Sequence, residues 1–243
     1  MKYKGRYIGA NHANGLMFGG VNSSFNDTFK DEEVLIGNGI GDIIPCVIGD
    51  ITDAYEALKD ELYNTKPSNI QELCECVFNI VFKYFGDYSN IEKRLDFYPD
   101  LDLIGMGEEI GKISNLKGQN AAMCVERAML SQNLLTSLGI DSTFKISGIK
   151  KDNSNEVHAY NLISYKDKHY IFDSTIPTLY NEKINPLICE IPQDVFEKIS
   201  SKESNIGYSV SIEHFNPLKN TNVTIVYDSD RENTYDLNEQ KTR

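Results

Sequence analysis

Apolar residues recur at helical spacing in three stretches of the first 140 residues. They predict helices over 50–63, 68–85 and 120–138, the last ended by Gly139. The middle helix has the most regular apolar stripe, which comprises Ile70, Leu73, Cys74, Val77, Phe78, Val81 and Phe85. A helix with such a stripe packs that face against a core.

Turn and cap residues delimit the middle helix. Ser68 and Gln71 have the spacing of a capping box, and Gly86 follows the last apolar position. A serine at the N-cap and a glycine just past the end are typical helix boundaries. The sequence therefore predicts a helix that begins at Ser68 and stops before Gly86.

The pattern changes after Gly139 to the two-residue alternation of strands. Strands are predicted over 142–148, 157–165 and 168–173, and the last two are joined by a polar turn around Lys166-Asp167. A helix over 192–200 and strands over 208–215 and 222–227 follow. Helices and strands are thus segregated along the chain, which favours an α+β fold.

The domain organisation follows from the same pattern. No internal repeat or linker interrupts the chain, so residues 1–228 are expected to form one α+β domain with a helical part at 50–110. Residues 229–243 are polar and are expected to be a frayed tail.

Charge and hydropathy exclude several partners. The net charge of −12 disfavours nucleic acid and anionic lipid, because both would be repelled. No segment has the roughly 20 apolar residues of a membrane helix, and the N-terminus lacks the apolar run of a signal peptide. We therefore expect a protein that is cytoplasmic, or is exported by a route without a cleaved leader, and that binds neither nucleic acid nor membrane.

Five cysteines are scattered through the chain, and this odd number indicates reduced thiols instead of a disulfide framework. Cys74 and Cys76 lie two residues apart on a predicted helix, where they cannot point at one metal ion. They are expected to pack in the core.

Cys124, His158 and Asp173 are the strongest candidates for chemistry. Cys124 lies near the start of a predicted helix, where the helix dipole favours a thiolate. A thiol, an imidazole and a carboxylate can act as nucleophile, base and orienting group. On its own, a cysteine in a helix or a histidine in a strand is more often structural.

The predicted hairpin links His158 to Asp173. A two-residue turn between Tyr165 and Lys168 places Asp173 opposite Tyr160. Cross-strand partners share a face of the sheet, and so do residues two apart on one strand. Asp173 and His158 are therefore expected to be diagonal neighbours within hydrogen-bonding reach.

Three segments in this order resemble the transglutaminase-like superfamily of papain-like thiol enzymes. They are Cys124-Val-Glu-Arg-Ala-Met-Leu with the following Leu134-Leu-Thr-Ser-Leu-Gly-Ile140, His158-Ala-Tyr-Asn-Leu-Ile, and Tyr170-Ile-Phe-Asp-Ser-Thr175. The resemblance covers residues 118–176. It implies a papain/transglutaminase-like core, in which the helix bearing the cysteine packs on an antiparallel sheet bearing the histidine and aspartate.

The resemblance also implies a reaction. Cys124 would attack an amide or ester carbonyl to form a thioester, and water or an amine would then take the acyl group. Gln119 is the expected oxyanion donor, together with the Cys124 backbone N–H. The expected substrate is a peptide, protein or small amide; no cofactor is implied, although some crosslinking relatives need calcium. The chain has no tryptophan, whereas relatives often carry one near the site.

Two alternatives remain from the sequence. The chain could be a non-catalytic binding or assembly module that keeps the fold without turnover. It could also transfer an acyl group from a thioester, as the related arylamine acetyltransferases do, although their Arg-Gly-Gly run before the cysteine is missing here.

Overall fold

The computed structural model describes residues 43–98, 110–151, 154–175 and 186–200 and the backbone of several short strands outside these ranges. Those strands are β1 (Arg6–Ile8), β2 (Asn11–Ala13), β3 (Leu16–Phe18), β4 (Ser24–Phe25), β5 (Val34–Gly37), β12 (Gly207–Val210) and β13 (Val223–Tyr227). The expected tail at 229–243 and the end of the strand predicted at 208–215 lie outside the described residues.

A seven-stranded sheet forms the centre of the fold. Its order is β11-β10-β9-β8-β12-β13, and β4 pairs with β8 at Phe144 and Lys145. The central strands are β8 (Asp141–Lys151), β9 (Ser154–Tyr165), β10 (Lys168–Asp173) and β11 (Leu187–Ile191). Neighbours from β8 to β11 are antiparallel. A smaller sheet in the order β1-β5-β6-β7 contains β6 (Ile43–Val47) and β7 (Gly111–Lys112).

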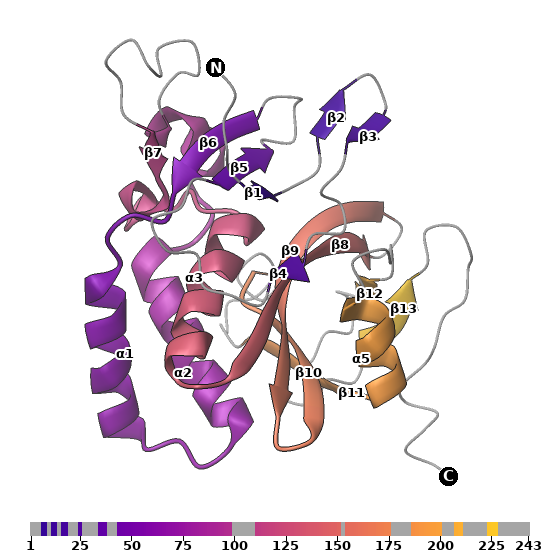
Figure 1. Cartoon of the computed structure of the whole chain (residues 1–243). Helices are drawn as coiled ribbons and strands as arrows, with labels where there is room; N and C mark the ends of the chain where they lie inside the picture. Colours follow the sequence, from indigo (N-terminus) through magenta and orange to yellow (C-terminus); the bar gives the residue numbers. More distant parts are fainter. Residues whose placement is uncertain are drawn as a thin grey trace.

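Helices cover the large sheet. The helices are α1 (Thr52–Thr65), α2 (Ile70–Phe85), α3 (Cys124–Ser137) and α5 (Gln193–Ser200), with the 3-10 helices η1 (Ile91–Phe97) and η2 (Ile113–Leu116). α3 packs on β8 and β9, α2 packs on α3, and α1 packs on α2. Figure 1 shows α1, α2 and α3 together on one side of the hairpin β9–β10, with α5 on the other. The structure is mixed helix and sheet, as the α+β prediction requires.

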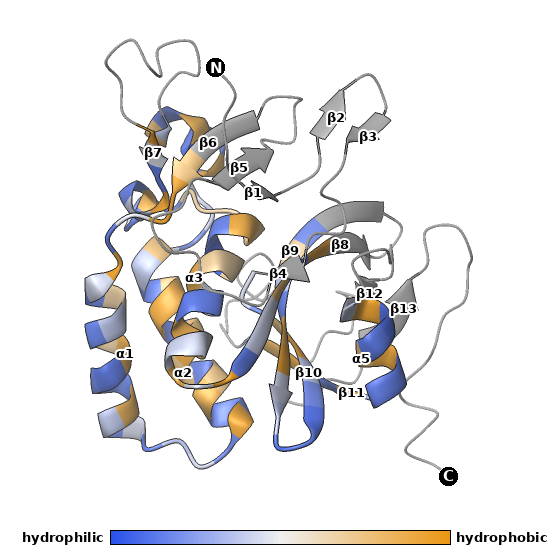
Figure 2. Ribbon diagram, in the orientation of Figure 1, coloured by the Kyte–Doolittle hydropathy of each residue, from blue (hydrophilic) through white to orange (hydrophobic). Residues whose placement is uncertain are grey.

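Burial explains the positions of the helices in this arrangement. α3 is buried over residues 125–135, including its polar side chains, because it lies between α2 and the sheet. α2 is mainly hydrophobic in Figure 2, whereas α1 is mostly hydrophilic with few hydrophobic positions. α1 therefore forms the outer layer, and it buries only Ala54 and Leu58 fully.

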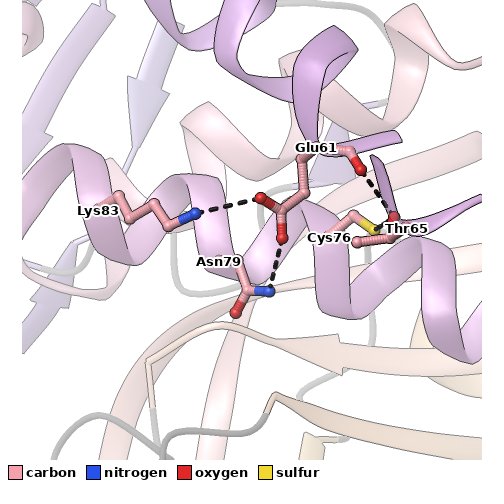
Figure 3. Close-up of polar contacts among 5 residues, drawn as sticks. All are labelled: Glu61, Thr65, Cys76, Asn79 and Lys83. Carbon is pink, nitrogen blue, oxygen red and sulfur yellow. Dashed lines mark hydrogen bonds and ion pairs between the residues drawn. The ribbon is translucent and has the colours of Figure 1, made fainter. Parts of the chain in front are cut away.

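Polar contacts tie α1 to α2 near their connection (Figure 3). Glu61 accepts hydrogen bonds from Asn79 and Lys83, both at 3.1 Å. The Thr65 hydroxyl lies 3.3 Å from the Cys76 sulfur. Cys74 and Cys76 are buried between packed helices, which confirms that they are core residues.

The hairpin prediction is confirmed in detail. Tyr165 pairs with Lys168, and the register continues to Phe172 opposite Asn161. The turn residues Lys166 and Asp167 have φ of 49° and 61°. Positive φ at both central residues is the feature of the hairpin turns whose twist matches that of the strands.

Three predicted helices have other bounds in the structure: α1 spans 52–65 where 50–63 was predicted, and α2 and α3 both start later than predicted. α2 begins at Ile70, because Asn69 is its N-cap and accepts the Glu72 N–H at 2.9 Å, whereas Ser68 bonds the Glu72 carboxylate from outside the helix. α3 begins at Cys124 and not at Asn120, which is left-handed with φ of 57°. The ends at Gly86 and Gly139 agree with the sequence.

No helix among the described residues is long and apolar enough to cross a membrane.

Candidate functional site

The late start of α3 follows from how the preceding loop docks on the end of α2. The Gly118 N–H donates to the Tyr84 carbonyl at 2.7 Å, and the Asn120 N–H donates to the Phe85 carbonyl at 3.0 Å. These carbonyls belong to the last turn of α2, where helical acceptors lack intrahelical partners. The loop satisfies them, so it cannot itself be helical, and α3 begins only at Cys124.

Gly86 makes this docking possible. Its φ of 79° lies in the region that favours glycine, and a Cβ at this position would overlap the Asn120 side chain. The Asn120 Oδ1 instead accepts the Asp87 N–H at 3.1 Å. The glycine that ends α2 therefore also sets the position of the chain that leads into Cys124.

Cys124 is the first residue of α3. Its N–H belongs to the first turn, whose N–H groups point out of the helix without an intrahelical acceptor. Cys124 is partly exposed, whereas the other four cysteines are buried. Burial raises the pKa of both Cys74 and Cys76. Cys124 is thus the accessible thiol of the chain.

His158 and Asp173 are hydrogen-bonded at the end of the hairpin. The Nε2 of His158 lies 2.7 Å from the Oδ2 of Asp173, and both side chains are buried. The second carboxylate oxygen of Asp173 accepts the Thr175 N–H at 2.7 Å. The diagonal contact predicted from the two-residue turn is therefore present.

The charges around His158 favour its protonated form. Burial alone would lower the pKa of His158, but the charge of Asp173, the charge of Cys124 and hydrogen bonds to both raise it to about 10 from 6.5. One imidazole thus interacts with a carboxylate from β10 and a thiol from the start of α3.

A buried ion pair that the sequence did not reveal lies just after Cys124. Glu126 is fully buried and accepts hydrogen bonds on Oε1 from the Arg94 Nε at 2.6 Å and the Tyr98 hydroxyl at 2.7 Å. Its Oε2 accepts the Met123 N–H at 3.0 Å. Burial raises the pKa of Glu126, but Arg94 and Tyr98 outweigh it and hold this pKa below its ordinary value.

Arg127 forms a second connection beneath the same turn of α3. Its Nη2 donates to the carbonyls of Gly86 at 2.6 Å and Asp87 at 3.0 Å, and its Nε donates to the Ala122 carbonyl at 3.1 Å. The guanidinium lies 4.6 Å from the centre of the Tyr88 ring. Arg127 thereby joins the end of α2 to the residues that precede Cys124.

Gln119 lies in the docked loop. Its N–H donates to the Leu116 carbonyl at 3.1 Å, and its carbonyl accepts from the Asn90 side chain at 3.1 Å. These contacts fix its backbone five residues before Cys124. The role of its side chain as an oxyanion donor stays a prediction.

A cavity of about 330 Å³ lies outside this group of residues. It is lined by Asp96, Phe97, Tyr98, Ile110, Gly111, Lys112 and Asn115. Tyr98 connects it to Glu126, but none of Cys124, His158 and Asp173 lines it. Within the described part of the chain, no group of three or more metal-ligating side chains comes together.

The similarity of this chain to known proteins is weak. No family model matches the chain, and no curated protein matches it. One similar solved structure is described as "Crystal structure of a TGase"; the TM-score is 0.35 and the sequence identity is 16%. The match covers 54% of this chain and 34% of that chain, so this chain spans about a third of its length.

Proposed function

We propose that this chain is a transglutaminase-like thiol enzyme that hydrolyses an amide or transfers its acyl group to an amine. One observation carries the proposal: the buried imidazole of His158 interacts both with the Asp173 carboxylate and with the Cys124 thiol at a helix start. A thiol, an imidazole and a carboxylate in this relation are the groups of a nucleophile, its base and the orienting residue.

In the first half of the reaction, the Cys124 sulfur attacks the carbonyl carbon of the substrate as a thiolate. The negative charge that develops on the carbonyl oxygen is stabilised by the Cys124 N–H and by the Gln119 side-chain amide. The His158 imidazolium then gives its proton to the leaving amine as the C–N bond breaks. The product of this half is a thioester on Cys124.

In the second half, water or an amine attacks the thioester carbonyl and gives its proton to His158. The C–S bond breaks, and the sulfur leaves as a thiolate beside the imidazolium. Asp173 binds Nε2 throughout, which keeps Nδ1 as the nitrogen that exchanges the proton. Hydrolysis and acyl transfer thus differ only in the acceptor.

A substrate screen tests this proposal. Peptides and proteins are incubated with and without an added primary amine, and the wild type is compared with Cys124→Ala. We expect release of the amine product in the wild type and none in Cys124→Ala. The matched control is Cys76→Ala, which removes a thiol near Thr65 and should keep turnover. Turnover that persists in Cys124→Ala contradicts the proposal.

Thiol alkylation separates an enzyme from a non-catalytic binding module. Iodoacetamide at pH 6 should label Cys124 ahead of the four buried cysteines, as measured by peptide mass spectrometry. His158→Asn should slow this labelling, because the thiolate loses its imidazolium partner. If Cys124 reacts no faster than a free thiol at this pH, the binding module is the better description.

A further inference from the structure

We propose that Glu126 is a positioning residue for Cys124, held in place by Arg94 and Tyr98. The proposal deepens the proposed function and rests on it, because it explains how the nucleophile is oriented. Glu126 touches neither His158 nor Asp173 by any hydrogen bond that we observe among the described residues. It acts through the backbone that carries the thiol.

The two oxygens of the Glu126 carboxylate bind different donors. Oε1 accepts from Arg94, with Nη2 at 2.5 Å, and from the Tyr98 hydroxyl. Oε2 accepts only the Met123 N–H among the hydrogen bonds we observe in the described residues. The first oxygen therefore anchors the carboxylate to η1 and its C-cap, and the second binds the N–H of Met123, the residue before Cys124.

Stability alone does not account for these groups. Removing two charges from water costs several kcal/mol for each ion, and well-packed apolar side chains often replace a buried ion pair without loss. Arg94 and Glu126 have exposed side-chain fractions of 4% and 0%. The pair is nevertheless placed two residues after the accessible thiol, where an apolar pair could fill the volume but could not accept the Met123 N–H.

The hydrogen bond from the Met123 N–H links this network to the orientation of Cys124. Met123 is the N-cap of α3, with extended backbone, and the chain turns into the helix at Cys124. The hydrogen bond from the Met123 N–H to the Glu126 side chain joins residues on either side of Cys124 and so restrains the rotation of this first helical residue. This rotation sets the direction of both the Cys124 sulfur and the Cys124 N–H. Errors of about 1 Å in such positions can lower rates by about a hundredfold.

The test replaces the whole network by apolar groups of similar size. The triple variant Arg94→Met, Tyr98→Phe, Glu126→Leu leaves no buried charge unpaired, so it should fold with a melting temperature near that of the wild type. It lacks the acceptor for the Met123 N–H. We expect the rate of Cys124 alkylation by iodoacetamide at pH 6 to fall about tenfold or more, with a matching fall in kcat and little change in KM.

Gln132→Met is the matched control on the same helix. Gln132 is also fully buried, and its side chain donates to the Ser142 carbonyl at 2.6 Å, two turns away from Cys124. This variant should lower the melting temperature, because it leaves polar partners in the sheet unpaired. Its Cys124 alkylation rate in the folded state should equal that of the wild type.

A single variant with unchanged volume gives a second measurement. Glu126→Gln has one amide oxygen for two sets of donors, so its amide N–H₂ must face either Arg94 and Tyr98 or the Met123 N–H. We expect slower alkylation of Cys124 than in the Gln132→Met control at equal folded fraction.

The outcomes separate the two proposals. If the triple variant folds and alkylates Cys124 at the wild-type rate, Glu126 has no positioning role, while the proposed function stands. If Cys124 of the wild type already reacts no faster than a free thiol at pH 6, the proposed function is wrong and the positioning role falls with it. A selective loss in the triple variant supports both.

Discussion

Two fully buried carboxylates, Glu126 and Asp173, both follow Cys124 in the sequence but have different partners. Asp173 contacts His158, a group that can lose its proton as the pH rises toward its raised pKa of about 10. Glu126 contacts Arg94, which stays charged at every accessible pH, and the Tyr98 hydroxyl. The same chemical group is therefore built into a site that can exchange a proton and into one that cannot.

The different partners of the two carboxylates predict different effects of mutation, on reactivity at Asp173 and on stability at Glu126. A carboxylate beside an imidazole controls which ring nitrogen carries the proton, so removing its charge should alter reactivity more than stability. A carboxylate beside an arginine is charge-balanced once folded, so breaking that pair should alter stability most. The variants below test whether the two sites separate in this way.

The largest effect is expected at Asp173. Asp173→Asn keeps the volume but presents an amide N–H₂ to Nε2, which forces the other tautomer and turns Nδ1 into the wrong partner for the thiol. Turnover of any substrate found in the screen should fall about 10³–10⁴-fold. Steady-state kinetics measure it, and circular dichroism checks the fold.

The contrast with Glu126 fails if Asp173→Asn keeps more than about a tenth of the wild-type turnover while remaining folded. In that case His158 would be oriented by other groups. Asp173 would then be a buried structural carboxylate.

Breaking the other pair should act on stability. Arg94→Met leaves the Glu126 charge buried with only hydrogen-bond donors, which should lower the free energy of unfolding by about 3–5 kcal/mol. Urea denaturation measures the change. The control is Lys59→Met at the exposed pair with Glu56, where the N–O distance is 2.7 Å but both side chains are mostly in water; it should be indistinguishable from the wild type.

The free energy of unfolding should depend on pH through the ionisation of His158, and not through Arg94, which stays charged. The folded-state pKa of His158 is raised to about 10 from 6.5. The stabilisation it supplies is fully present below pH 6.5 and is lost as the pH rises through about 10. The free energy of unfolding should therefore decline between these values, and the decline should be smaller in Asp173→Asn. An unchanged decline in that variant would remove Asp173 as its cause.

The smallest effect is expected at Tyr98. Tyr98→Phe removes one donor to Glu126 and leaves both Arg94 bonds, so it should cost about 1.5–3 kcal/mol, less than the loss of Arg94. Thermal denaturation of both variants checks the order. A cost equal to that of Arg94→Met would mean that the hydroxyl, and not the guanidinium, holds the carboxylate.

The sequence predicted the hairpin side of the site well. Strand alternation and a polar pair between Tyr165 and Lys168 fix the register, and register alone places His158 beside Asp173. These are local patterns, so no knowledge of the rest of the fold is needed.

The helix side was less predictable, because distant residues decide it. Asn120 looks like the start of a helix, but it is bound to the end of α2, more than 30 residues earlier. Arg94 lies 32 residues before Glu126, and no periodic pattern connects them. The one local signal was Glu126 itself, whose position three residues after Met123 is that of a capping residue.

The length of the turn at Lys166 and Asp167 determines whether Asp173 faces His158, so the site should be sensitive to insertions in this turn. Both residues are exposed and make no contact with Cys124 that we observe in the described residues, so substitutions that accept their positive φ should be tolerated. One extra residue in this turn, however, would shift one strand against the other by a single step and send Asp173 to the opposite face from His158. In a scan of single-codon insertions, this surface turn should therefore be as intolerant as the protein interior, while substitutions at the same codons are tolerated unless they introduce proline or a β-branched residue, which do not fit the positive φ.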